Sequence, residues 1–186
     1  MGMQQVSVIE APYEDVLSKD YFDSENISNN ITFVTNPTKT KLFKGIPQHL
    51  VNVIQKENIT YNFHHDGVLP EVFRKYPGLQ DYTVIAHAYD LKGVEYVAAI
   101  EHKKYPIYAI QFHPEKNLHT WKYNSNVPHS LNAIELAQYF GNFFVNEARK
   151  NFNSFKNSAS ETQARIENYK FFFDDANNIR NYLFKE

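Results

Sequence analysis

The most informative absence in this sequence is cysteine, which does not occur once among the 186 residues. A chain without cysteine forms neither disulfide bonds nor thiolate metal sites. It also supplies no cysteine nucleophile of its own for covalent catalysis.

The sequence also shows no excess of positive charge, no long apolar run and no signal-peptide pattern in its first residues. The formal net charge is -2, and lysine and arginine are scattered, so nucleic acid is not expected as a partner. No apolar run approaches the roughly 18 residues that a membrane helix requires, and residues 1–6 lack the basic and apolar regions of a signal peptide. Hydrophobic residues make up 42% and charged residues 22% of the chain. We expect one domain, or one piece of a domain, over residues 1–186.

The order of residue patterns predicts an α/β protein. Residues 12–26 are acidic and irregular, and residues 116–130 read as a loop. Asn132 and Glu135 have the spacing of a capping box at the start of the best helix, which ends near Arg149 and Lys150. The other expected helices are residues 3–11, a segment entered at Pro47 and a brief helix from Pro70; the expected strands are 31–35, 59–63, 82–89, 94–100 and 107–112. An apolar patch at residues 169–173 in the tail favours packing in a core over a role as a contact surface.

A possible catalytic pair follows the strand at residues 107–112. His113 and Glu115 are two residues apart, so on a strand both side chains project to the same side. The carboxylate can then hold one ring nitrogen of the imidazole and leave the other free as a general base. Because Pro114 stops the strand, we expect the pair at the carboxyl end of the sheet, where open α/β sheets place their sites.

The surrounding residues resemble a known family. Gln111-Phe-His-Pro-Glu after an apolar strand is the signature of the class I glutamine amidotransferase fold, in which a cysteine, the histidine and the glutamate form a triad. Residues 105–116, Trp121-Lys122 and residues 143–151 resemble γ-glutamyl hydrolases in particular. A glutaminase domain is the alternative within the fold, and Trp121 and residues 146–149 argue against it.

This resemblance implies the C-terminal part of a three-layer αβα fold. The succession of three strands over residues 82–112 predicts that this part is a mixed sheet with an antiparallel section. The family's nucleophile lies on a sharp turn, and residues 1–5 are similar to the part that follows the cysteine. The missing cysteine is therefore expected directly before Met1, and residues 1–186 are expected to form a single but incomplete domain.

The resemblance also implies a reaction. A cysteine thiolate would attack the γ-glutamyl amide of a folylpoly-γ-glutamate, with His113 as the base and Glu115 orienting it. The backbone amide of Met1 would contribute to the oxyanion hole, and His64 would help to hold the substrate. No cofactor is implied, and the family is lysosomal, vacuolar or secreted. His113, Glu115 and His119 are residue types of a two-histidine, one-carboxylate metal site, but Pro114 and the change from strand to loop between them argue against convergence on one ion.

Two functions follow for the chain itself. In the first function, the chain is a fragment of an active hydrolase and is inactive alone because the nucleophile is missing. In the second it is a non-catalytic structural or binding subunit. An exposed sheet edge would then favour a protein partner or a homo-oligomer.

Overall fold

The computed structural model describes residues 2–174 and 179–184. They form two compact units, Met1–Ala148 and Arg149–Glu186, each of which is described by itself. The expectation of a single, incomplete domain over residues 1–186 stays a prediction.

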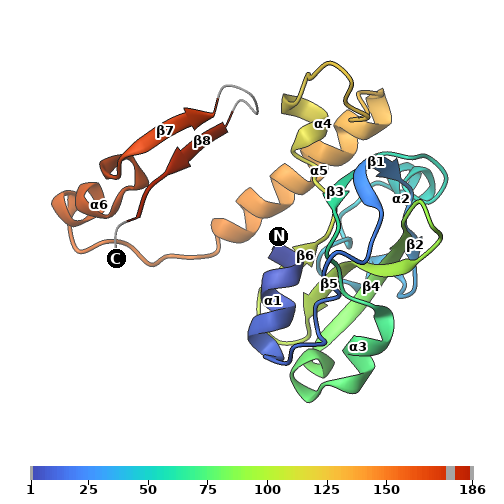
Figure 1. Cartoon of the computed structure of the whole chain (residues 1–186). Helices are drawn as coiled ribbons and strands as arrows, with labels where there is room; N and C mark the ends of the chain where they lie inside the picture. Colours follow the sequence, from blue (N-terminus) through green and yellow to red (C-terminus); the bar gives the residue numbers. More distant parts are fainter. Residues whose placement is uncertain (1, 175–178, 185–186) are drawn as a thin grey trace. The chain divides into compact units, whose positions relative to one another are not determined.

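The first unit holds two antiparallel sheets and the helices that cover them (Figure 1). Its elements are α1 (Gly2–Glu10), β1 (Ser24–Asn29), β2 (Thr32–Phe33), η1 (Pro37–Lys39), α2 (Gln48–Val53), β3 (Thr60–His64), α3 (Pro70–Lys75), η2 (Pro77–Asp81), β4 (Tyr82–Tyr89), β5 (Glu95–His102), β6 (Tyr108–Ile110), α4 (Lys116–His119) and α5 (Leu131–Ala148).

The larger sheet has the strand order β2-β4-β5-β6, and β1 pairs with β3 in a separate two-stranded sheet. The long hairpin of β4 and β5 pairs Tyr82 with His102 and Tyr89 with Glu95. The antiparallel section expected from three successive strands is therefore confirmed. The parallel section that a mixed sheet requires has no counterpart among the strands of residues 2–174 and 179–184.

Two apolar cores lie on opposite faces of the larger sheet. On one face, Leu136 and Phe140 of α5 and Leu50 of α2 pack with Ile85 of β4. The other core is formed by residues of α1, α3 and the strands, among them Met3, Val72, Val97, Ile100 and Ala109. The unit thus mixes helices with antiparallel sheets, which is consistent with the α/β fold predicted from the sequence.

Most elements expected from the sequence are present, with shifted ends. The structure corrects two segments that were expected to be irregular. Residues 24–26, the end of one of these segments, belong to β1, because the backbone of β1 pairs with β3 across a register shift between Ser24 and Ile27. Residues 116–119 form the short helix α4. Neither segment has an apolar repeat that would reveal it locally.

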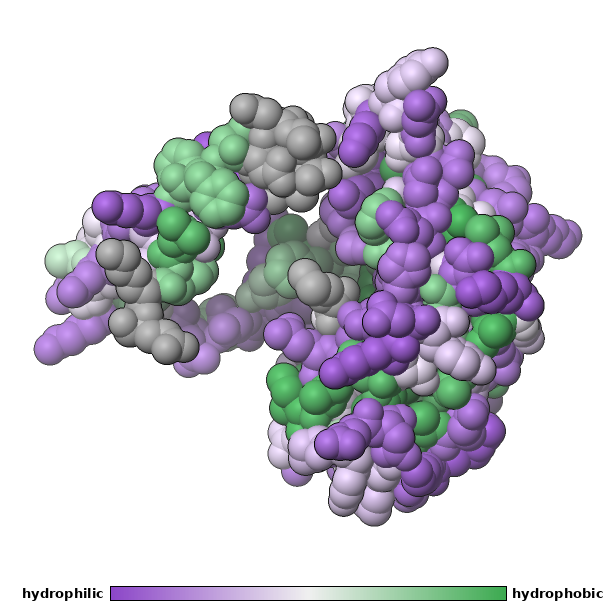
Figure 2. All heavy atoms as spheres, in the orientation of Figure 1, coloured by the Kyte–Doolittle hydropathy of each residue, from purple (hydrophilic) through white to green (hydrophobic). Residues whose placement is uncertain are grey.

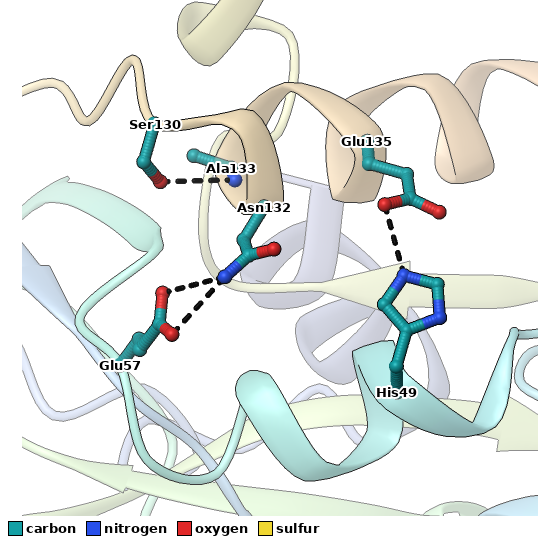
Figure 3. A network of polar contacts seen from close by, with 6 residues as sticks. All are labelled: His49, Glu57, Ser130, Asn132, Ala133 and Glu135. Carbon is teal, nitrogen blue, oxygen red and sulfur yellow. Dashed lines mark hydrogen bonds and ion pairs between the residues drawn. The ribbon is translucent and has the colours of Figure 1, made fainter.

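The start of α5 differs from the predicted capping box (Figure 3). Ser130 is the N-cap: its Oγ accepts the N–H of Ala133 at 3.2 Å, and its carbonyl oxygen accepts the N–H of Ile134 at 3.0 Å. Asn132 instead donates its amide to both carboxylate oxygens of Glu57 at 3.0 Å. The carboxylate of Glu135 lies 2.9 Å from His49 Nε2. The side chains of the predicted box therefore make tertiary contacts.

The second unit contains α6 (Ser158–Ala164), η3 (Ile166–Asn168), β7 (Phe171–Asp174) and β8 (Ile179–Tyr182). Phe171, Phe172 and Phe173 are 53%, 52% and 49% exposed. The prediction that this apolar patch packs in a core is therefore wrong for these three side chains. Figure 2 shows apolar side chains on the surface of this unit as green spheres. Among the described residues, no helix is long and apolar enough to cross a membrane.

Candidate active site

The position of His113 is fixed by its backbone. β6 ends at Ile110, and the chain then bends toward β3. The N–H of His113 donates to the carbonyl oxygen of Tyr61 at 2.8 Å, which attaches the turn to the second residue of β3. His64 is the last residue of the same strand, three positions after Tyr61.

His113 and Glu115 are in contact, but not for the reason that their spacing suggested. His113 Nδ1 lies 2.9 Å from Glu115 Oε1. Both residues follow the end of β6, and Glu115 has helical torsion angles of φ -63° and ψ -27° at the start of α4. The turn brings the two side chains together, so the strand geometry predicted for them is wrong.

This contact determines the charge state of Glu115. Burial raises the pKa of Glu115, but the hydrogen bond and the charge of His113 outweigh burial, and the pKa lies below its usual value. The carboxylate therefore stays ionised and accepts a hydrogen bond from Nδ1, which directs the Nε2 lone pair away from Glu115. The His113 side chain is 32% exposed, so that lone pair can meet a reacting group.

His64 is a second imidazole in this region, and it is buried. Its Nδ1 donates to the carbonyl oxygen of Asp66 at 2.9 Å, while Nε2 is buried without a partner among the described residues. Burial lowers the pKa of His64 to about 4, and the charge of His113 contributes to the same direction. Near neutral pH, His64 thus presents an unused acceptor, which is unusual for a buried polar atom. Its assignment to the substrate stays a prediction.

The first turn of α1 reaches the same place. Gln4 Nε2 donates at 2.8 Å to the carbonyl oxygen of Asp66, which also accepts His64 Nδ1. α1 also packs beside β6, the strand that leads to His113. The amide of Met1, predicted to belong to an oxyanion hole, lies outside the described residues.

A polar network that sequence reasoning missed supports the turn. Asn26 Oδ1 accepts the hydroxyl of Tyr61 at 3.1 Å and the N–H of Asn126 at 2.9 Å. Asn26 Nδ2 donates to the carbonyl oxygen of Asn124 at 3.2 Å. Asn26 has a φ of 53°, a conformation that asparagine tolerates better than most residues. An isolated asparagine in an irregular segment carried no signal of this role.

The loop held by this network presents an exposed aromatic pair. Trp121 stacks on His129 with ring centroids 3.7 Å apart and planes 8° apart. Trp121 is 75% exposed, and His129 Nδ1 lies 3.0 Å from the carbonyl oxygen of Asn117.

No group of three or more possible metal ligands occurs in residues 2–174 and 179–184, so His119 does not join the pair at 113 and 115.

Comparisons with known proteins identify the family of this chain. The family model of class-I glutamine amidotransferases matches residues 25–125. The chain is 36% identical over 170 residues to γ-glutamyl hydrolase B of Dictyostelium discoideum, covering 91% of this chain and 48% of that protein. Identity to the γ-glutamyl hydrolase of Mus musculus is 32% over 171 residues, covering 92% of this chain and 52% of that protein. Identity to the γ-glutamyl hydrolase of Homo sapiens is 31% over 149 residues, covering 80% of this chain and 46% of that protein.

The chain thus spans about half the length of the curated relatives it matches. The family match covers more than half of the chain and includes β3, His64, His113 and Glu115. The chain belongs to the class-I glutamine amidotransferase family, and its curated relatives in that family are γ-glutamyl hydrolases.

Proposed function

We propose that this chain is the C-terminal part of a γ-glutamyl hydrolase, with His113 as the general base and Glu115 as its orienting carboxylate. The observation that carries the proposal is the 2.9 Å contact between His113 Nδ1 and Glu115 Oε1. The names of the relatives support the same reaction, and the substrate class is a poly-γ-glutamate, as in a folylpoly-γ-glutamate.

The proposed reaction uses a cysteine that these 186 residues do not contain. His113 Nε2 takes the thiol proton, and the thiolate attacks the γ-glutamyl carbonyl carbon. The carbon–nitrogen bond breaks while His113 returns the proton to the leaving amine, and water then hydrolyses the thioester. These steps conserve protons and electrons without a cofactor.

The cysteine is proposed to lie directly before Met1, at the start of α1. The hydrogen bonds of Gln4 and His64 to one carbonyl oxygen, that of Asp66, support this placement because they hold the first turn of α1 beside an active-site histidine. The oxyanion would be met by the amide of Met1 and by a donor outside this chain. We propose that His64 accepts a hydrogen bond from the substrate through Nε2.

The proposal predicts that the 186-residue chain alone has no hydrolase activity. The test is hydrolysis of pteroyl-tri-γ-glutamate by the purified chain and by a longer protein that includes the residues encoded upstream. We expect turnover only from the longer protein, and a loss of about 100-fold or more in kcat for its His113→Ala variant. His119→Ala, which changes an exposed histidine on α4, is the matched control. Turnover by the short chain, or full activity of His113→Ala, would contradict the proposal.

A non-catalytic subunit is the second candidate. The exposure of Phe171, Phe172 and Phe173 favours it, because apolar patches of this kind mark interaction surfaces. A protein partner or a second copy would cover such a surface. Light scattering after size-exclusion chromatography checks self-association: a monomer at all concentrations would count against it.

We further propose a lysosomal, vacuolar or secreted location, by similarity to the relatives.

A further inference from the structure

A pocket of about 670 Å³ lies beside α3, η2 and β4, apart from the candidate active site. None of His64, His113 and Glu115 lines it. Its volume lies in the range of pockets that hold small organic ligands. The pocket therefore has room for a ligand of its own.

The inner wall of the pocket is apolar and firmly packed. Phe73 of α3 and Tyr82 of β4 line it and are each 5% exposed. Val84 of β4 lines it as well, and Val34 forms part of the rim with 51% exposure. Val34 is held by its backbone, whose N–H donates to the carbonyl oxygen of Ile85 at 2.9 Å. Two rings and two branched side chains favour a ligand with a flat apolar body.

The charged side chains that line the pocket are basic. They are Arg74 and Lys103, and no aspartate or glutamate is among the lining residues. Lys103 is fixed in place, since its Nζ donates to the carbonyl oxygen of Gln80 and its N–H to that of Asp81 at 2.9 Å. Gln80 Nε2 in turn donates to the carbonyl oxygen of Arg74 at 3.2 Å. These bonds connect the Lys103 ammonium and the backbone of Arg74 with one short segment, residues 80–81.

Two carboxylates contact residues that line the pocket, and both already have partners. Glu95 Oε1 lies 2.9 Å from His87 Nδ1 and accepts the hydroxyl of Tyr89 at 3.0 Å. Glu10 accepts the hydroxyl of Tyr82 at 3.1 Å. The Arg74 side chain has no hydrogen bond to any of the described residues, although its charge acts on Glu95. Its guanidinium is therefore available to a ligand carboxylate.

We propose that this pocket binds a small aromatic carboxylate. The ring would lie against Phe73 and Tyr82, and the carboxylate would meet Arg74 and Lys103. A guanidinium suits this role because its donors match the two oxygens of a carboxylate. The binding is separate from the proposed hydrolysis, which takes place around His113.

The test uses 2-naphthoate as the probe and the full 186-residue chain. Binding is followed by titration with two-dimensional NMR, which also locates the site. We expect saturable shifts for amides of α3, η2 and β4, and an affinity at least about 5-fold higher than for the neutral analogue 2-naphthylmethanol. Absence of saturation, or shifts confined to other parts of the chain, would overturn the proposal.

Variants separate the charge from the apolar wall. Arg74→Gln is expected to weaken 2-naphthoate binding by about 5-fold, and Lys44→Gln, which removes an exposed lysine outside the pocket, is expected to leave it unchanged. Val34→Glu keeps the backbone bond to Ile85 and places a negative charge on the rim, so it is expected to abolish binding. Equal affinities of Arg74→Gln and Lys44→Gln would overturn the role of the guanidinium. Tighter binding of tri-γ-glutamate than of 2-naphthoate would overturn the aromatic selectivity.

Discussion

His113 donates its backbone N–H to the carbonyl oxygen of Tyr61 at 2.8 Å. The hydroxyl of the same tyrosine donates to Asn26 Oδ1 at 3.1 Å. Tyr61 therefore connects the turn that carries the proposed base with β1 and with the loop that presents Trp121. The geometry around His113 depends on contacts between segments far apart in the sequence.

The buried imidazole of His64 is expected to make the stability of the protein depend on pH. Its pKa in the folded chain is about 4, against an ordinary value of 6.5, so between these values the unfolded chain binds the additional proton. The stabilising effect is complete above pH 6.5 and is lost as the pH falls toward 4. Between pH 7 and pH 5 the free energy of unfolding should fall by about 2 kcal/mol from this group alone.

Urea denaturation at both pH values measures the effect. The His64→Gln variant should show a pH dependence smaller by about that amount. His119→Gln is the control, because His119 is exposed. The same pH dependence in His64→Gln as in the unchanged chain would show that the imidazole is not held neutral.

Asn26 is expected to matter through both its side chain and its backbone. Asn26→Ala removes the bonds to Tyr61, Asn124 and Asn126 and places alanine at a φ of 53°, so we expect a loss of about 2 kcal/mol in stability. Asn26→Gly removes the same bonds without the backbone strain, and should be about 1 kcal/mol more stable than Asn26→Ala. Chemical denaturation compares the two.

Hydrogen exchange tests the side-chain bond of Asn26 to Asn126, which both variants remove. The amide of Asn126 loses its acceptor in both variants, so its exchange should be faster in both than in the unchanged chain. Unchanged protection at Asn126 would mean that Asn26 does not hold the loop.

The N-cap of α5 gives a prediction that distinguishes it from the capping box. Ser130→Ala removes the acceptor for the Ala133 N–H and should destabilise the protein by about 1 kcal/mol. Asn132→Ala removes only an exposed contact with Glu57 and should cost about 0.5 kcal/mol or less. Thermal unfolding of both variants measures the difference, and a larger loss for Asn132→Ala would restore the capping box.

Two glycines should respond to alanine in opposite directions. A Cβ on Gly78 would lie 2.0 Å from the carbonyl oxygen of Glu10 at the end of α1, and this backbone clash should cost about 2 kcal/mol or more. A Cβ on Gly141, inside α5, meets nothing within 4 Å. Gly141→Ala should therefore stabilise the protein by about 1 kcal/mol, the difference in helix propensity. Urea midpoints of both variants check the signs.

Local patterns predicted the regular elements well where the pattern was strong. β4 has the predicted bounds of Tyr82 and Tyr89. In α5, Ala133, Ala137 and Phe140 lie on the buried face, whereas Phe144, which continues the same apolar spacing, is 73% exposed. Patterns failed where the partner lies far away in sequence. β1 exists because β3 pairs with it, and Asn132 and Glu135 bond with Glu57 and His49 instead of capping the helix.

The sequence by itself determined the family, the absence of a cysteine, and the identity of the His113–Glu115 pair, because these depend only on which residues are present and in what order. Only the tertiary structure decided how the pair is held. The bond from His113 to Tyr61 and the bond from Gln4 to the carbonyl oxygen of Asp66 join residues separated by up to 62 positions. The burial of His64 likewise depends on the folded chain. Such contacts depend on how the chain closes its long loops, which no local residue pattern encodes.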